Sequence, residues 1–126
     1  MKFINKYHEV FYKDCLRLTR KNDSYRRALF YTLGIHEDTR KHINELYDFE
    51  NECIILEALE KGWMTAGTYR ACLLAFNLYN GYTDNEPAES TPYNLFCDSN
   101  ASYYFEAIKI RYPEYIKEKQ CDYERY

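Results

Sequence analysis

The sequence has few residues that interrupt secondary structure: four glycines and three prolines among 126 residues. It also lacks long hydrophobic runs, because the longest, at 53–56 and 71–76, fall far short of the roughly 20 residues that a membrane span needs. The opening residues turn polar too early for a signal peptide. We therefore expect no membrane span and a cytoplasmic location.

Motifs that would carry chemistry are absent as well. The four glycines, at positions 34, 62, 67 and 81, form no phosphate-binding loop. Three histidines and five cysteines are present, yet Cys-x-x-Cys, His-x-x-x-His and nucleophile motifs do not occur. We therefore predict no metal ion, no cofactor and no enzymatic activity. A catalytic site assembled from distant residues stays open, since no local motif can exclude it.

The five cysteines are an odd number and include no close pair. Three of them, Cys15, Cys53 and Cys72, fall on apolar positions of expected helices. Buried thiols are favoured over disulfides, in keeping with a reducing cytoplasm.

What the sequence does contain is helical periodicity, with apolar residues at three- and four-residue steps. It predicts an all-α fold, a compact single-domain bundle of about six helices over 1–116 with a polar tail at 117–126. The expected helices span 5–20, 24–33, 36–47, 51–61, 65–80 and 99–112, with a short helical turn at 92–96. The helix at 65–80 is the most apolar and is expected to be central.

Helix boundaries and faces follow from particular residues. The predicted N-caps are Asn5, a cap within 22–24, Asn51, Thr65 and Thr91. Gly34, Gly62 and Gly81 are expected to end helices. The expected core side of the first helix carries Tyr7, Val10, Phe11, Cys15 and Leu18. That of the fourth carries Ile55, Leu56 and Leu59.

Charge is distributed unevenly along the chain. Residues 1–48 carry ten basic and seven acidic side chains (+3), while residues 49–106 carry two and nine (−7). This acidic middle block disfavours general nucleic-acid binding and permits an acidic face that meets a basic partner.

Tyrosine is over-represented, with 15 residues. Tyr7, Tyr25, Tyr69 and Tyr104 fall on helix stripes and are expected to pack. Other tyrosines gather beside the acidic loop and toward the C-terminus: Tyr82, Tyr93, Tyr103, Tyr112, Tyr115, Tyr123 and Tyr126. Tyrosine is enriched where proteins bind proteins, although the codon bias of an AT-rich genome would account for the excess equally well.

An alternative binding surface is basic. Side chains cluster around the first connection between helices: Arg17, Arg20, Lys21, Tyr25, Arg26 and Arg27. Phosphate contacts beside a stacking ring would suit a single-stranded nucleic acid. A solvated corner between helices is the commoner explanation of such a cluster.

Several stretches resemble an uncharacterised family of small proteins from Firmicutes and their phages and mobile elements. They are Tyr31-Thr-Leu-Gly-Ile35, Thr39-Arg-Lys-His-Ile43, Ala75-Phe-Asn-Leu-Tyr-Asn-Gly81, Leu95-Phe-Cys97 and the segment from Tyr103 that ends Ile110-Arg-Tyr-Pro-Glu-Tyr115. The resemblance covers about residues 3–116 and carries over no functional residue.

The resemblance implies a context in which small accessory proteins often block a host defence machine. The leading hypothesis is an anti-defence protein, anti-CRISPR-like, whose partner is a host defence nuclease or its nucleic-acid-binding surface. Carboxylates would replace phosphates opposite Arg or Lys, and rings would replace bases. The predicted partner-binding residues are Tyr82, Asp84, Glu86, Glu89, Tyr93 and Asp98. The alternative is a nucleic-acid-binding regulator that uses residues 17–27.

Overall fold

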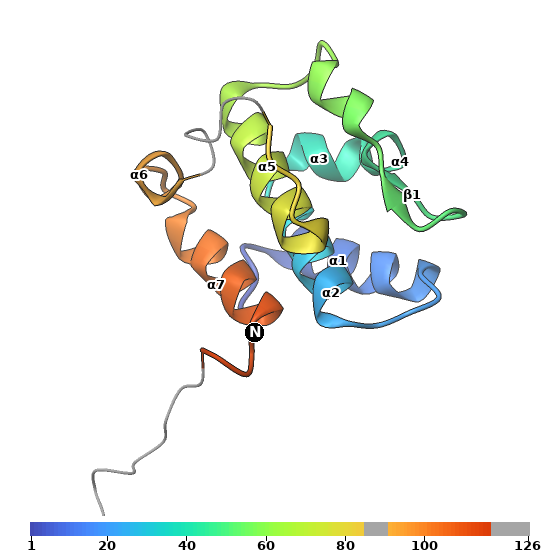
Figure 1. The fold of residues 1–126 in the computed structure, drawn as a ribbon, viewed down its shortest axis with the longest axis horizontal. Helices are drawn as coiled ribbons and strands as arrows, with labels where there is room; N and C mark the ends of the chain where they lie inside the picture. Colours follow the sequence, from blue (N-terminus) through green and yellow to red (C-terminus); the bar gives the residue numbers. More distant parts are fainter. Residues whose placement is uncertain (85–90, 117–126) are drawn as a thin grey trace, which may run out of the picture.

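The computed structural model describes residues 1–84 and 91–116, which are mostly helical (Figure 1). These ranges contain seven α-helices, one 3-10 helix and one two-stranded antiparallel sheet. The elements are α1 (Lys6–Leu18), α2 (Ser24–Leu33), α3 (Glu37–Lys41), α4 (Ile43–Leu46), β1 (Tyr47–Asp48), β2 (Cys53–Ile54), η1 (Leu56–Glu60), α5 (Ala66–Asn80), α6 (Pro92–Leu95) and α7 (Ala101–Arg111). The all-α prediction is confirmed. The predicted tail at 117–126 lies outside the described residues.

The predicted ends of the long helices are confirmed by their caps. Asn5 Oδ1 accepts from the His8 N–H at 3.0 Å, and Asp23 Oδ1 accepts from the Arg26 N–H at 2.9 Å. Thr65 begins α5 with a capping box. Gly81 ends it in the left-handed region, at φ 81°, where a residue without Cβ is favoured. The caps therefore set the length of the two helices, α2 and α5, that fill the core.

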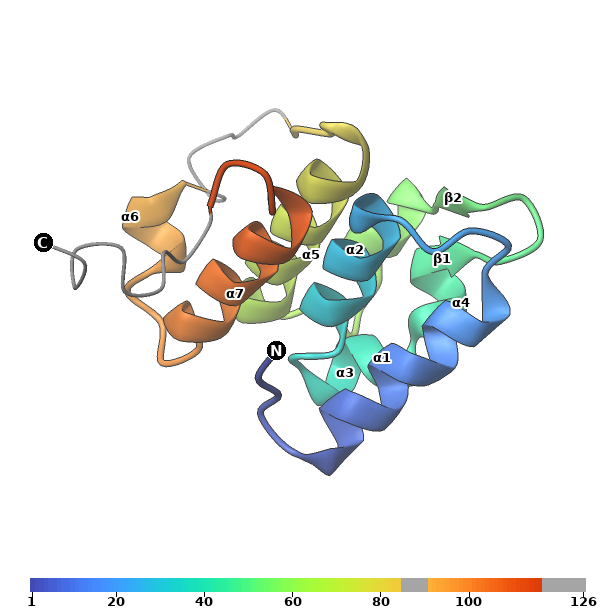
Figure 2. The same cartoon turned by 90° about the horizontal axis from the view of Figure 1, so that it is seen from below.

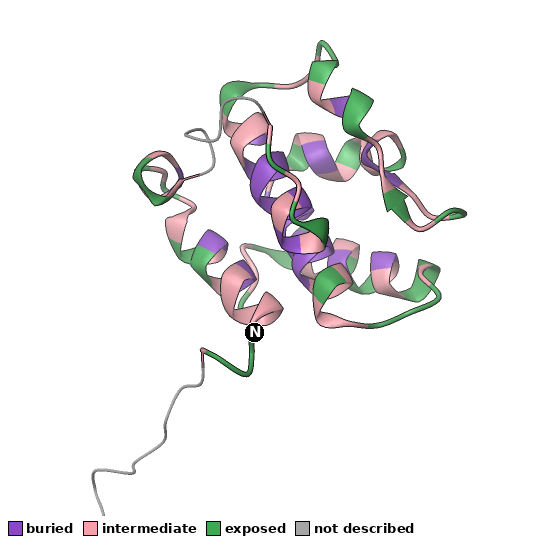
Figure 3. Cartoon of the chain, viewed as in Figure 1, coloured by how far each residue is buried: buried purple, intermediate pink, exposed green. Residues whose placement is uncertain are grey.

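Helix α2 occupies the centre of the molecule. All of residues 28–33 are buried, and α2 packs against α1, α5 and α7 (Figures 2 and 3). The helices α6 and α7 lie at one end of the molecule and the β1–β2 hairpin at the other. The helix at 65–80, expected to be central, is α5, which packs along one side of α2 and has eight buried residues of its own.

The segment from 36 to 61 differs most from the prediction. The expected helix at 36–47 is two short helices followed by β1, and the expected helix at 51–61 is a hairpin followed by η1. Asp48 causes the turn, because its Oδ1 accepts from the N–H groups of Glu50 and Asn51 at 2.9 and 3.1 Å. Asn51 is thus a turn residue and not a helix cap.

Aromatic packing holds this hairpin against the core. The Phe49 ring stacks on Phe30, with 5.6 Å between centroids, and the Tyr47 ring meets Phe30 edge-on at 5.1 Å. Burial of these rings needs the extended backbone of 47–48. Leu56, expected to face the core of a helix, is exposed, and so is Cys53.

The core face of α1 was predicted only in part, since Cys15 is buried and Phe11 packs against the core as expected. Its buried residues are His8, Tyr12 and Cys15, while Tyr7, Val10 and Leu18 are exposed. The difference arises at His8, a polar residue that is not among the expected core residues. Its two ring nitrogens find hydrogen-bond partners in the core, which turns that side of the helix inward.

The buried thiols follow the prediction at two of the three expected positions. Cys15 and Cys72 are free and buried, and burial raises the pKa of each thiol to about 12. Both are therefore inert at neutral pH.

Gly34 lies where α1 and α2 approach closely. A Cβ at this position would lie 2.6 Å from His8 Cδ2 and 2.9 Å from Phe11 Cδ1. We expect Gly34→Ala to lower the free energy of unfolding by about 1–3 kcal/mol through overpacking, measured by urea denaturation.

Gly67 is the matched control, because a Cβ there would have no atom within 4 Å. In a helix, Gly67→Ala should raise the free energy of unfolding by about 0.5–1 kcal/mol. Equal stability of the two variants would contradict the close approach at Gly34.

Candidate functional site

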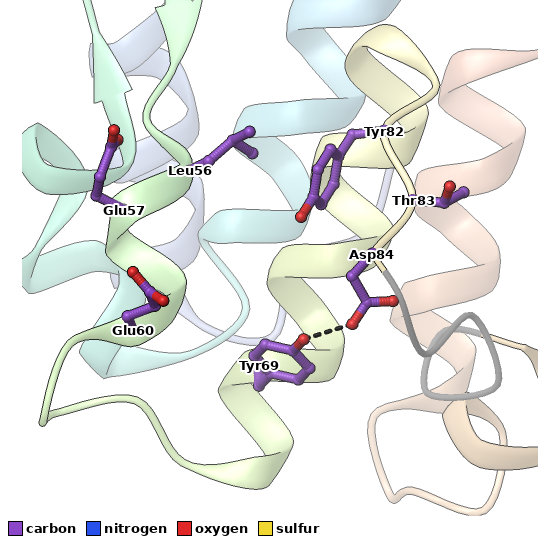
Figure 4. Close-up of a pocket in the computed structure, with 7 residues that line it drawn as sticks. All are labelled: Leu56, Glu57, Glu60, Tyr69, Tyr82, Thr83 and Asp84. Carbon is purple, nitrogen blue, oxygen red and sulfur yellow. Dashed lines mark hydrogen bonds between the residues drawn. The ribbon is translucent and has the colours of Figure 1, made fainter.

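A hollow of about 620 Å³ opens between η1 and the C-terminal exit of α5 (Figure 4). We call it the acidic hollow, and it is lined by Leu56, Glu57, Glu60, Tyr69, Tyr82, Thr83 and Asp84. Carboxylates line it from both sides, with Glu57 and Glu60 on η1 and Asp84 on the opposite chain segment. The hollow thus combines negative charge with two aromatic rings.

The exit of α5 fixes one side of the acidic hollow. After the left-handed turn at Gly81, the Tyr82 N–H donates to Asn80 Oδ1 at 3.0 Å. The Asn77 Nδ2 group donates to the Tyr82 carbonyl at 3.1 Å. These bonds turn the chain back along α5, and the Tyr82 ring packs edge-on against Phe76 at 6.2 Å between centroids. The position of Tyr82 is therefore set by the helix end.

A hydrogen bond ties the turned chain to the first half of α5. The Tyr69 hydroxyl donates to Asp84 Oδ2 (Figure 4). Tyr69 was expected only to pack, and its side chain is instead half-buried with the hydroxyl in the acidic hollow. Asp84 thus has a structural role beside its charge.

The two glutamates of η1 differ from most carboxylates of the molecule. Glu57 and Glu60 are exposed, and within residues 1–84 and 91–116 their side chains make no hydrogen bond or ion pair. By contrast, Glu9, Glu37 and Glu106 each lie within 4 Å of a lysine ammonium. The acidic hollow therefore presents two uncompensated negative charges to solvent.

The predicted partner-binding residues are only partly brought together. Tyr82 and Asp84 line the acidic hollow, whereas Tyr93 is exposed on α6. Asp98 is held by the fold, since it accepts from the Asn100 N–H at 2.7 Å and from the Tyr104 hydroxyl at 3.4 Å. The predicted residues Glu86 and Glu89 lie outside the described residues.

The sequence interpretation missed Glu57, Glu60 and Leu56 as lining residues. The distribution of charge along the sequence could have indicated the two glutamates, because both belong to the acidic block at 49–106. They were assigned to an ordinary helix, and their position opposite Tyr82 depends on how η1 packs.

The predicted basic cluster is largely used by the fold itself. Arg17 pairs with Asp14, Arg20 donates to the Glu50 carbonyl, and Arg26 pairs with Asp23 and Glu52. Of the six, only Lys21 has a side chain that makes no hydrogen bond, ion pair or ring contact within residues 1–84 and 91–116.

The two remaining members of that cluster are also engaged. Arg27 donates to the carbonyl and Oδ1 of Asn22 at 3.1 and 2.8 Å. The Arg111 guanidinium lies 3.8 Å from the ring centroid of Tyr25, a tyrosine that was expected to pack and is exposed. Few of these side chains are left for phosphate contacts.

Comparison with known proteins gives one relationship. The family of unknown function DUF6075 matches residues 1–124. The chain belongs to this family. Neither a curated protein nor a solved structure matches the chain. The predicted membership of a small uncharacterised family is thereby confirmed.

For this DUF6075 member, the described residues 1–84 and 91–116 contain neither a membrane-spanning helix nor a metal-binding cluster. No helix within them is long and apolar enough to cross a membrane. In the same ranges, no three His, Cys, Asp or Glu side chains form a group that could hold a metal ion.

Proposed function

We propose that the protein is an accessory protein of Firmicutes phages and mobile elements that binds and inhibits a host defence protein, in the manner of an anti-CRISPR. The binding surface is the acidic hollow, with the two tyrosines that line it, Tyr69 and Tyr82. The observation that carries this proposal is the pair of uncompensated carboxylates, Glu57 and Glu60, beside the Tyr82 ring.

The chemistry of the acidic hollow complements a basic surface of the kind with which proteins bind nucleic acids. A carboxylate accepts charge-assisted hydrogen bonds from Arg or Lys as a phosphate does. A tyrosine ring offers a flat face on which a guanidinium or a base-binding side chain packs. An inhibitor with these groups would occupy the surface that the defence nuclease uses for its nucleic acid.

The proposal is tested by reversing the charge of the acidic hollow. Glu57→Lys/Glu60→Lys is preferable to a change at Asp84, because Asp84 also accepts the hydrogen bond from Tyr69. Wild-type protein, expressed in a Firmicutes host with an active CRISPR–Cas nuclease, is expected to raise transformation by a targeted plasmid at least tenfold. The double variant should lose this effect, because lysines would repel the basic partner surface.

The matched control is Glu50→Lys/Glu114→Lys. It changes net charge equally, at two exposed glutamates that lie outside the acidic hollow. It should keep the protective effect. No protection by the wild type, or equal protection by all three proteins, would refute the proposal.

The nucleic-acid-binding alternative is separated by a gel-shift titration of the purified protein. Only a regulator would bind DNA or RNA alone, with an affinity that falls steeply as salt is raised. Binding of that kind, lost in Lys21→Glu, would favour the alternative.

A further inference from the structure

The outer side of α1 carries apolar side chains that nothing in the described residues covers. Tyr7, Val10 and Leu18 are 74%, 44% and 63% exposed. Helix α1 lies at the edge of the molecule, away from α6 and α7 (Figure 2). Steps of three and four residues place these side chains in one row with Asp14. The row from 7 to 18 is about 16 Å long at the rise of an α-helix.

Basic side chains border both ends of this row. At the Tyr7 end there is a separate hollow of about 500 Å³ lined by Asn5, Tyr7, Glu37, Arg40 and Lys41. Arg40 uses one N–H for the Gly34 carbonyl, at 2.7 Å, and a guanidinium has five. At the Leu18 end, Arg17, Arg20 and Lys21 are exposed. Arg17 and Lys41 are paired with Asp14 and Glu37, so the positive charge left for a partner comes from Arg40 at one end and from Arg20 and Lys21 at the other. A partner with an apolar stripe and acidic ends complements this surface.

A second copy of the chain fits this surface poorly. In an antiparallel two-fold pair, each α1 would meet the same flank of the other. That flank carries Lys6, Lys13 and Arg17 at seven- and four-residue steps, with Glu9 as the acid that pairs with both lysines. The flank keeps a net positive charge, and Lys6 would face the partner's Arg17. Like charges in contact disfavour this arrangement.

A nucleic acid fits poorly for a different reason. Phosphates could pair with the basic side chains at the two ends of the row. A phosphate backbone, however, offers no apolar surface against which Val10 and Leu18 could be buried. An amphipathic helix supplies both the apolar surface and the negative charge, because its apolar stripe can cover the row while its flanks carry acids.

We infer that the outer face of α1 binds an acidic amphipathic helix of another protein. This surface is formed by Tyr7, Val10 and Leu18, with Arg40 at one end and Arg20 and Lys21 at the other. It does not include the acidic hollow, so the inference stands or falls independently of the proposed function.

The test uses a synthetic, fluorescein-labelled helical peptide of about 18 residues with leucines at i, i+3, i+7 and i+11 and glutamates on both flanks. Fluorescence anisotropy measures its binding to wild-type protein and to Val10→Ser/Leu18→Ser. We expect the variant to bind at least tenfold more weakly. A peptide with lysines in place of the glutamates should bind wild type at least tenfold more weakly than the acidic peptide.

Phe105→Ser/Tyr115→Ser is the matched control, because both side chains are exposed, at 49% and 84%, but lie on α7 and after it. It should bind the acidic peptide within twofold of wild type, and far-UV circular dichroism should show all variants folded. The inference is overturned by equal binding of the peptide to Val10→Ser/Leu18→Ser, or by no binding to wild type. Dimerisation in sedimentation equilibrium, or oligonucleotide binding, that this variant abolishes would likewise overturn it.

Discussion

Replacing Arg26 with methionine is expected to lower the free energy of unfolding by about 3–5 kcal/mol, because it leaves a buried carboxylate without its cation. Arg26 and Glu52 are only 12% and 11% exposed at their side chains, and Arg26 Nε donates to Glu52 Oε1 at 2.9 Å. The other oxygen, Glu52 Oε2, has no hydrogen-bond partner among the described residues. Without Arg26, neither oxygen would be compensated.

This ion pair matters beyond its two members because it connects three elements. Glu52 lies at the end of the hairpin turn with a φ of 57°, in the left-handed region, and its carbonyl accepts from the Tyr79 hydroxyl of α5 at 2.8 Å. The same hydroxyl lies 3.2 Å from that of Tyr47. Arg26 anchors this turn to α2, so its loss should also loosen the hairpin.

Urea denaturation, monitored by far-UV circular dichroism, measures the loss in free energy of unfolding. Glu37→Gln is the control, because the Glu37–Lys41 pair is 69% and 64% exposed and a surface pair of this kind contributes about 0–1 kcal/mol. Arg26→Met/Glu52→Gln should be more stable than Arg26→Met alone, since the buried charge is then gone. A loss below about 1 kcal/mol in Arg26→Met would contradict a buried, uncompensated carboxylate.

The parts of the fold that could be predicted from the sequence are those fixed by interactions between residues close together in the chain. The caps Asn5 and Thr65 bond to backbone groups three residues away, and Gly81 is selected by its own φ. A single sequence contains these signals in full, so the long helices were predicted to within about two residues. The all-α class follows from them.

The hairpin at 47–54 could not be predicted in this way. Its extended backbone depends on Phe30, which is 17 residues before Tyr47 and belongs to another element. The inward side of α1 likewise depends on the Tyr31 carbonyl that His8 reaches across the helix interface. Tertiary contacts of this kind override local periodicity.

Only one side of the candidate site could be predicted, because local signals fix that side and tertiary packing fixes the other. Tyr82 and Asp84 follow a helix end that the sequence marks clearly, and they lie in the acidic block. Glu57 and Glu60 share that block, but their place across from Tyr82 results from the 3-10 helix that follows the mispredicted hairpin.

The second large effect concerns His8, which is fully buried in the core. Its Nδ1 accepts from the Ile4 N–H at 3.2 Å, so Nε2 must carry the proton and donate to the Tyr31 carbonyl at 2.8 Å. The ring also packs edge-on against Phe3 at 5.1 Å between centroids. Added protonation would put an N–H at Nδ1 against the Ile4 N–H. The neutral form is therefore built into the fold.

This arrangement makes stability depend on pH. Burial lowers the pKa of His8 below its ordinary value of 6.5, and outweighs the bond to the Tyr31 carbonyl, which raises it. Burial likewise lowers the pKa of His36, against the raising effect of Asp98. The unfolded chain thus binds protons below pH 6.5 that the folded chain does not. Stability is fully present above the unfolded pKa and is lost as the pH falls toward the folded pKa.

We expect the free energy of unfolding to fall by up to about 1 kcal/mol for His8 between pH 7 and 5.5, measured by urea denaturation across that range. His8→Gln should reduce the slope, because the titrating group is gone. It should also cost about 2–4 kcal/mol at pH 7 through lost packing and hydrogen bonds. If His8→Gln keeps the wild-type slope, the acid sensitivity arises from other groups and the assignment to His8 is wrong.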